Sequence, residues 1–157
     1  MIDKKFANLL SLALVALSVV LWFFLVPLKY ESGGFINVTS EATYLQGAFG
    51  LETTILGVNL QILEFSFLNL IPLVLMVVAG LGVLAAFLKP KDLDSNGLKI
   101  GVILLTLVSL VLLMLVKTFL VPTTEGSFDE HALTFQAFII PALLLLTIVL
   151  QVLKKAK

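Results

Sequence analysis

Residues 65–88 read FSFLNLIPLVLMVVAGLGVLAAFL, a run of 24 residues without a charged side chain. A helix rises about 1.5 Å per residue, so about 20 apolar residues cross the ~30 Å hydrocarbon core of a bilayer. Three further runs of this kind lie at 6–28, 100–121 and 133–153, and only Lys117 places a charge inside one of them. The sequence therefore predicts an all-α membrane protein, in which a single domain of 157 residues forms a bundle of four transmembrane helices.

The composition supports this interpretation and excludes several functions. The chain is 60% hydrophobic, and its mean hydropathy of +1.15 is far above that of an ordinary soluble domain. The net charge is zero, so nothing indicates a surface for nucleic acid. Cysteine is absent, which excludes thiol–disulfide enzymes, and all ten cationic residues are lysine. The arginine fork that suits phosphate and carboxylate recognition is therefore missing.

The lysines are distributed unevenly between the segments that connect the four runs. If all four runs cross, both termini and the connecting loop 89–99 share one side, and every lysine except Lys29 and Lys117 lies there. The positive-inside rule then places both termini in the cytoplasm of a multi-pass cell membrane protein. No small-residue cleavage site follows the first run, so we expect a retained helix rather than a signal peptide.

The first outer loop, 29–64, is long, whereas the second, 122–132, is short. Residues 58–62 alternate apolar and polar side chains with period two, residues 35–39 have strand composition, and 47–50 reads as a break. A loop of this length without its own structure is uncommon, so we expect a small extracellular antiparallel β-sheet on the outer mouth of the bundle. The residues that we expect to contact helix ends or another subunit are Phe49, Val58, Leu60 and Ile62.

Small residues on two of the runs indicate close helix packing, because they let neighbouring helix backbones approach. These positions are Ala7, Ser11, Ser18, Ala79, Gly82 and Ala86. The inner loop 89–99 is short, charged and turn-like, and we interpret it as a solvated connector. We interpret Lys154 and Lys155 as the anchor that ends the fourth helix at the membrane surface.

Four polar residues near the outer ends of the helices form a candidate polar site: Glu64, Asn69, Lys117 and Gln136. Glu64 would begin the second helix, where the helix dipole favours an acid, and its alternative role is ion or proton coordination with Asn69 and Gln61. Lys117 either extends its long side chain to the interface or pairs with Glu64. We interpret His131, the single histidine, as a solvated loop residue that is able to sense pH.

No group of residues indicates catalysis, a bound metal or a cofactor. Intramembrane proteases need Ser/His, paired Asp or HExxH inside their spans, and proton-coupled transporters need a buried ionisable relay. The four runs show none of these patterns, so we expect a protein that is not an enzyme.

The layout resembles that of the claudin-like tetraspan group: inner termini, a long first outer loop with strand character, a short inner turn and a short second outer loop. The resemblance is one of architecture, because the outer loop has neither tryptophan nor cysteine. The chain is also similar to uncharacterised four-helix membrane proteins of low-GC Gram-positive bacteria, through its aromatic–glycine patch at 47–50 and the FSFLNL entry at 65–70. Both resemblances imply a fold and no activity.

We therefore expect a non-enzymatic tetraspan that acts by contact in the lipid bilayer, either by self-association as a homo-oligomer or as a small subunit of a larger membrane complex. The alternative is a small transporter, channel or lipid-binding protein that uses the polar site near the outer helix ends. Convergence of the four polar residues would favour this alternative.

Overall fold

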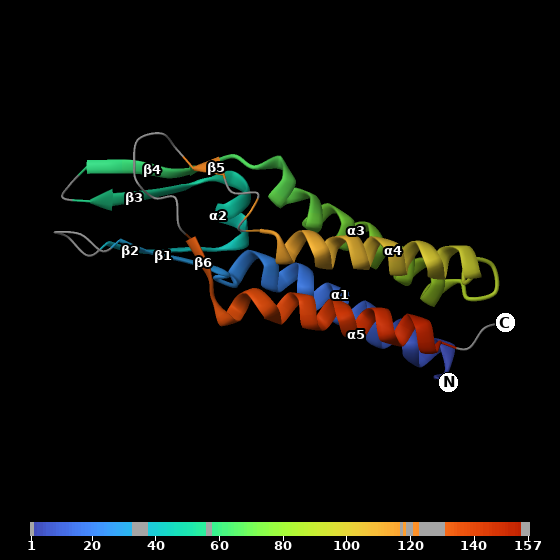
Figure 1. Cartoon of the computed structure of the whole chain (residues 1–157). Helices are drawn as coiled ribbons and strands as arrows, with labels where there is room; N and C mark the ends of the chain where they lie inside the picture. The colour runs from blue at the N-terminus through green and yellow to red at the C-terminus, as the bar shows by residue number, and fades with distance from the viewer. Residues whose placement is uncertain are drawn as a thin grey trace.

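The computed structural model describes residues 2–32, 38–55, 58–116, 118, 121–122 and 131–154. Its long helices are α1 (Lys4–Phe24), α3 (Phe67–Leu88), α4 (Asn96–Met114) and a last helix that begins as the 3-10 turn η1 (Phe135–Phe138) and continues as α5 (Ile139–Leu153). All four are long and apolar enough to cross a membrane. Figure 1 shows them side by side, with both termini and the α3–α4 loop at one end and the strands at the other. We call these the terminal end and the sheet end.

The helices are offset from the apolar runs that predict them. α1 ends at Phe24 rather than at residue 28, because the backbone is extended from Leu25 onward. α4 begins at Asn96 rather than at residue 100, because Ser95 caps it: its hydroxyl oxygen accepts a hydrogen bond from the Leu98 amide at 3.1 Å. An apolar run shows only which residues are compatible with lipid. The ends of α1 and α4 depend instead on where backbone groups find hydrogen-bond partners.

The four helices form a closed ring in which α1 contacts α3 and α5, and α4 contacts the same two helices. Five of the six small residues expected at helix contacts are buried, and Gly82 is half-buried. A Cβ atom on Gly82 would lie 3.2 Å from Cγ2 of Val102, so α3 approaches α4 closely at this glycine. A Cβ atom on Gly80 would lie 3.2 Å from Cγ1 of Val15 on α1. The glycines of α3 thus serve contacts inside the bundle.

The sheet end holds two antiparallel sheets, where the sequence led us to expect one. The first has the order β2 (Val38–Ala42), β1 (Leu28–Ser32), β6 (His131–Leu133), and the second has the order β3 (Leu51–Ile55), β4 (Val58–Glu64), β5 (Val121–Pro122). Each is a hairpin from the first connecting segment, completed by a short strand from the second. The third strands satisfy backbone groups on one edge of each hairpin, which a lone hairpin leaves open.

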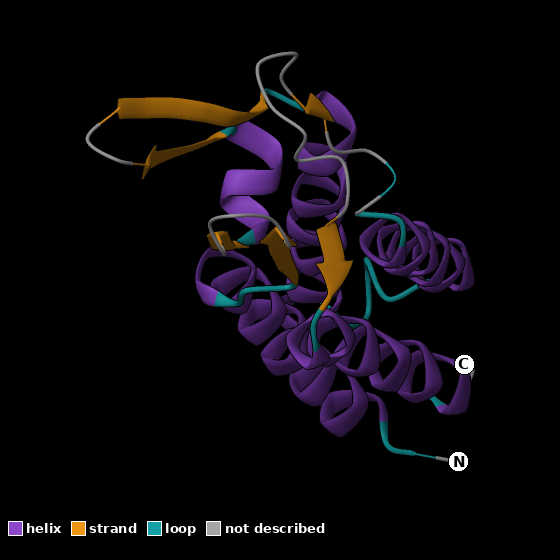
Figure 2. Cartoon of the chain, turned by 60° about the vertical axis from the view of Figure 1, so that its left-hand side comes forward, coloured by secondary structure: helices purple, strands orange, loops and turns teal. Residues whose placement is uncertain are grey.

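A short helix, α2 (Tyr44–Phe49), replaces the break expected at 47–50. Thr43 and Gln46 form a reciprocal capping box at its start, and Gly50 ends it with a φ of 109°, a conformation that favours glycine. Figures 1 and 2 place α2 between the β3–β4 hairpin and the rest of the molecule. Glu64 is the last residue of β4, so it does not begin the helix as expected; that helix begins at Phe67.

We predict that Gly82→Leu destabilises the bundle, because even a Cβ atom there would lie 3.2 Å from Val102 and 3.5 Å from Leu98 of α4, and a leucine side chain is larger. Overpacking of this kind costs about 1–3 kcal/mol. The matched control is Gly101→Leu on α4, since a Cβ atom there meets nothing within 4 Å. Thermal unfolding in mild detergent should give a lower midpoint for G82L and an unchanged one for G101L. Equal midpoints for the two variants would contradict the close α3–α4 contact.

Candidate functional site

Five buried polar residues meet at the terminal end, and we call them the terminal-end cluster: Asn8, Ser11, Asp94, Gln151 and Lys154. Its centre is an ion pair in which Lys154 Nζ lies 2.6 Å from Asp94 Oδ1. Asn8 contacts both charged groups, because its Oδ1 accepts from Lys154 Nζ at 3.2 Å and its Nδ2 donates to Asp94 Oδ2 at 3.2 Å. One amide therefore bridges the carboxylate and the ammonium.

Gln151 extends the cluster along the bundle. Its Nε2 donates to Ser11 Oγ at 2.8 Å and to Asn8 Oδ1 at 3.4 Å. Asn8 and Ser11 are three residues apart on α1, and Gln151 and Lys154 are three apart at the end of α5, so each pair lies on one helix face. The cluster therefore joins the start of α1, the end of α5 and the α3–α4 loop.

Backbone contacts reinforce the same junction. The Ile2 amide donates to the Leu153 carbonyl at 3.0 Å, and Lys99 Nζ donates to the carbonyls of Val152 and Lys154 at 3.4 and 3.3 Å. The last carbonyls of a helix lack partners within the helix, so these donors satisfy groups that α5 leaves open. The segments next to both termini are thus fixed to one another.

The cluster overturns two expectations from the sequence. The loop at 89–99 is not fully solvated, because Asp94 is only 4% exposed. Lys154 is 3% exposed and paired, so it is not a free surface anchor. The buried Lys154–Asp94 pair lies just outside the apolar runs, so it does not contradict the expectation that those runs hold no ionisable relay. The available signal was the polar pair at Asn8 and Ser11, which faces the polar pair at Gln151 and Lys154.

The terminal-end cluster acts as a clamp, in the sense that it holds the start of α1, the end of α5 and the α3–α4 loop together. Burying two charges is costly unless their mutual attraction and further hydrogen bonds compensate, and here Asn8 supplies those bonds to both charges. In the part of the chain that the structure describes, no three His, Cys, Asp or Glu side chains gather as metal ligands would. The cluster holds segments together with charges that are already paired.

A second set of contacts fixes α2 at the sheet end. The Tyr44 ring stacks on Trp22 of α1, with ring centroids 6.5 Å apart, and its hydroxyl donates to the Ala137 carbonyl at 3.3 Å. Asn69 Nδ2 of α3 donates to the Gly47 carbonyl at 3.1 Å. α2 is thereby tied to α1, α3 and η1. Burial raises the pKa of the Tyr44 phenol above its ordinary value, because the anion would lose its solvation.

Two residues of the expected polar site, Asn69 and Gln136, have different hydrogen-bond partners. Asn69 binds α2, whereas Gln136 Oε1 accepts from the Val26 amide at 2.8 Å. Glu64 ends β4, and Lys117 lies outside the described residues. Two buried polar atoms of the described residues have no hydrogen-bond partner, Trp22 Nε1 and Asn69 Oδ1, and both side chains contact α2.

The remaining expected positions also fall at the sheet end. Phe49, the last residue of α2, is 54% exposed. Val58, Leu60 and Ile62 lie in β4, which confirms the strand expected there, although their side chains are not among those described. His131 belongs to β6, where it is opposite Tyr30 of β1, rather than to a loop.

Comparisons of the chain with protein-family models, with curated proteins and with solved structures find no match. The function has to be inferred from the chain's own geometry.

We predict that Asp94→Asn strongly destabilises the protein, because it leaves the Lys154 ammonium buried without a counter-charge. Removing one partner of a buried ion pair costs about 3–5 kcal/mol. The double variant Asp94→Asn with Lys154→Met should recover most of this loss, since it removes the orphaned charge. The control is Asp92→Asn at an exposed acid of the same loop. Denaturant unfolding in detergent measures all three, and equal stability of D94N and D92N would contradict the clamp.

We predict an alkaline loss of stability that depends on Tyr44. The folded protein holds the phenol proton more tightly than the unfolded chain, whose phenol titrates near pH 10. The contribution of the Tyr44 phenol to the free energy of unfolding is therefore complete below about pH 10, and it is lost as the pH rises above that value. Unfolding of Tyr44→Phe, measured from pH 8 to 12, should show a shallower decline than the unaltered protein. Parallel declines would contradict this role of the phenol.

Proposed function

We propose that this chain is a multi-pass membrane protein that acts by contact and not by catalysis, either with a second copy of itself or as a small subunit of a larger membrane assembly. The terminal end would lie in the cytoplasm, because it carries Lys4, Lys5 and the lysines of the α3–α4 loop. The sheet end, built from α2 and the six strands, would lie outside and would make the contact.

The state of the polar groups inside the bundle supports this proposal. The hydroxyls of Ser18, Thr106, Ser109 and Thr147 each donate to the carbonyl four residues earlier in their own helix. The buried side chains between the two ends are otherwise mainly aliphatic, as at Val15, Val83 and Leu144. Most polar groups in the described interior are therefore already hydrogen-bonded within the protein. Few of them remain to bind a substrate or an ion.

The observation that carries the proposal is a pair of exposed aromatic rings at the sheet end. Phe49 of α2 and Phe65, just before α3, have ring centroids 5.8 Å apart, and they are 54% and 52% exposed. The opposite face of α2 is buried against the bundle, so the backbone beneath Phe49 is held in place. Rigid aromatic side chains are enriched in protein interfaces, where they bury a large area at a small entropic cost.

One observation favours the alternative, a small transporter, channel or lipid-binding protein with a polar site at the sheet end. Trp22 Nε1 and Asn69 Oδ1 are a donor and an acceptor that remain unsatisfied in the interior. Buried groups of this kind are costly unless water or a ligand completes them. Loss of a transport or binding signal in Asn69→Leu, with the assembly state unchanged, would favour this alternative over contact.

We predict that Phe49→Ala weakens assembly at least tenfold, since a central aromatic contact in an interface is worth about 2 kcal/mol or more. The matched control is Phe24→Ala at the end of α1, a more exposed ring (74%) outside the Phe49–Phe65 pair. Crosslinking in native membranes and light scattering in mild detergent report the assembly state. A wild-type protein that is monomeric in both, with no co-purifying partner, would overturn the proposed function.

A further inference from the structure

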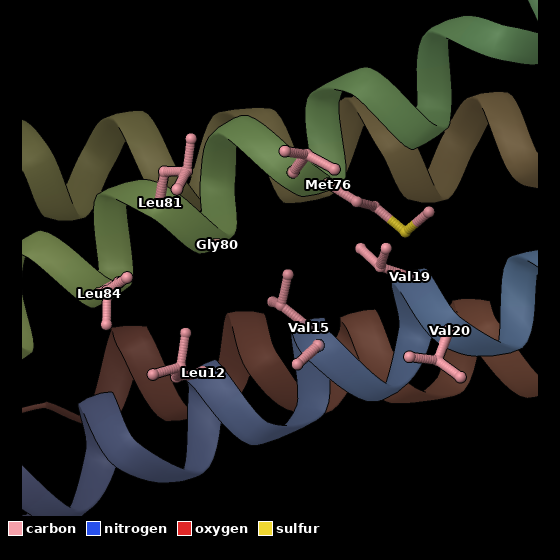
Figure 3. Close-up of a pocket in the computed structure, with 10 residues that line it drawn as sticks. Leu12, Val15, Val19, Val20, Met76, Gly80, Leu81 and Leu84 are labelled. Carbon is pink, nitrogen blue, oxygen red and sulfur yellow. The ribbon is translucent and has the colours of Figure 1, made fainter.

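A groove of about 340 Å³ lies between α1 and α3, near the middle of both helices. Figure 3 shows Val15 and Val19 of α1 and Met76 of α3 around it, with Gly80 on α3 between Met76 and Leu84. The lining residues are leucine, valine, alanine and glycine, together with one methionine, and none carries a polar side chain.

The groove opens toward the surroundings of the bundle. Its floor contains Val15 and Met76, which are buried, whereas Ala16, Val20 and Leu81 on its rim are exposed. Below it, Ser11 is bonded to Gln151 in the terminal-end cluster, and above it, Trp22 is covered by Tyr44 of α2. A ligand therefore enters from the side, where a membrane-spanning bundle meets hydrocarbon.

The length and volume of the groove indicate which kind of molecule fits it. It runs along α1 from Leu12 to Val20, and the eight steps between these residues span about 12 Å of helix. If a methylene group takes roughly the ~30 Å³ share of a liquid water molecule, the volume holds about ten of them in a row. A partner helix is about 10 Å wide, and a stable protein interface buries at least about 1,200 Å² in total, far more than so small a groove offers. The bulky rim side chains of Leu12, Leu81 and Leu84 also hold a helix backbone away.

We propose that this groove binds one acyl chain of a membrane lipid. The chain enters sideways between α1 and α3 and packs against Val15 and Met76, in the space beside the close approach of Gly80 to Val15. Contacts with the fixed walls replace those of a disordered neighbouring lipid, so the bound chain exchanges slowly. The groove has no polar group for a headgroup, so it selects the chain. This site is separate from the Phe49–Phe65 pair, and the inference goes beyond the proposed function.

Trp22 provides a direct probe, because it is the single tryptophan and it packs in the same core cluster as Met76 and Val19. The purified protein in detergent micelles is titrated with phosphatidylcholine whose acyl chains carry bromine, which quenches tryptophan fluorescence on close approach. We expect saturable quenching at about one lipid per protein. Quenching that rises without saturation would overturn the inference, because it would indicate only bulk lipid around the helices.

Ala16→Phe is the test variant, since an aromatic ring at this exposed rim position occupies the groove itself. Ala13→Phe is the matched control, because Ala13 is also exposed on α1 and does not line the groove. We expect A16F to need at least tenfold more lipid for half-maximal quenching and A13F to behave as the unaltered protein. If A16F does not fold, Val20→Phe replaces it, with the exposed Leu17→Phe as its control.

Equal lipid dependence in the filled variant and its control would overturn the acyl-chain site. That outcome is distinct from failure of the proposed function, because assembly and lipid binding are altered by different residues. F49A should keep the saturable quenching, and A16F should keep the assembly state of the unaltered protein.

Discussion

The Lys154–Asp94 ion pair, bridged by Asn8, is the interaction on which the arrangement of the bundle depends. Helices surrounded by lipid gain little from the hydrophobic effect when they associate, because lipid chains are as apolar as leucine. Packing alone would leave α1 and α5 free to slide past each other along their apolar faces. A buried ion pair that joins α5 to the α3–α4 loop, with one α1 amide bonded to both charges, permits a single register. Specificity of this kind is what buried polar groups are best known to supply.

The two ends of the bundle are fixed by different means. The terminal end uses charge and hydrogen bonds, whereas the sheet end uses α2, whose buried face stacks Tyr44 on Trp22 and accepts a bond from Asn69. The third strands β5 and β6 then connect the segment after α4 to the hairpins that follow α1 and α2. Every long helix is therefore restrained at both ends, and the middle of the bundle is held by apolar packing and close glycine contacts.

The amino-acid sequence predicts the four helices well, because their length and apolar character are required by lipid itself. It predicts less of the sheet end, because there the aliphatic residue types that elsewhere form helices form β-strands. Leu115 and Val116 continue the apolar run and yet lie beyond α4, and Val121 of the same run belongs to β5. Glu64 ends a strand because β4 continues almost to the helix. The capping box at Thr43 and Gln46 was present in the sequence, and it would have predicted α2 in place of a break.

The terminal-end cluster was harder to predict than the helices for a physical reason. Hydropathy averages over a window, so an asparagine and a serine in an apolar run barely alter it, although their three-residue spacing places them on one face. What no local pattern contains is the pairing of Asn8 with Lys154, 146 positions along the chain. That contact depends on helix order and register, which arise from the packed bundle. The sequence likewise predicts a solvated Asp94, because the burial of this side chain depends on the packing of the folded loop against α1.

The groove between α1 and α3 is a consequence of how the two helices are held, which is at their ends and at one close contact between them. Gly80 lets α3 approach α1 closely at Val15, while Leu12 and Leu84 on one side and Val20 and Val77 on the other are too bulky for equal approach. Two helices that meet at one close point and are fixed at their ends must leave space beside that point, since their side chains fill it incompletely. If the bundle spans a membrane, as proposed, lipid is the one component always present to fill that space. The position of the groove is therefore set by the clamp at one end, α2 at the other and the glycine between them.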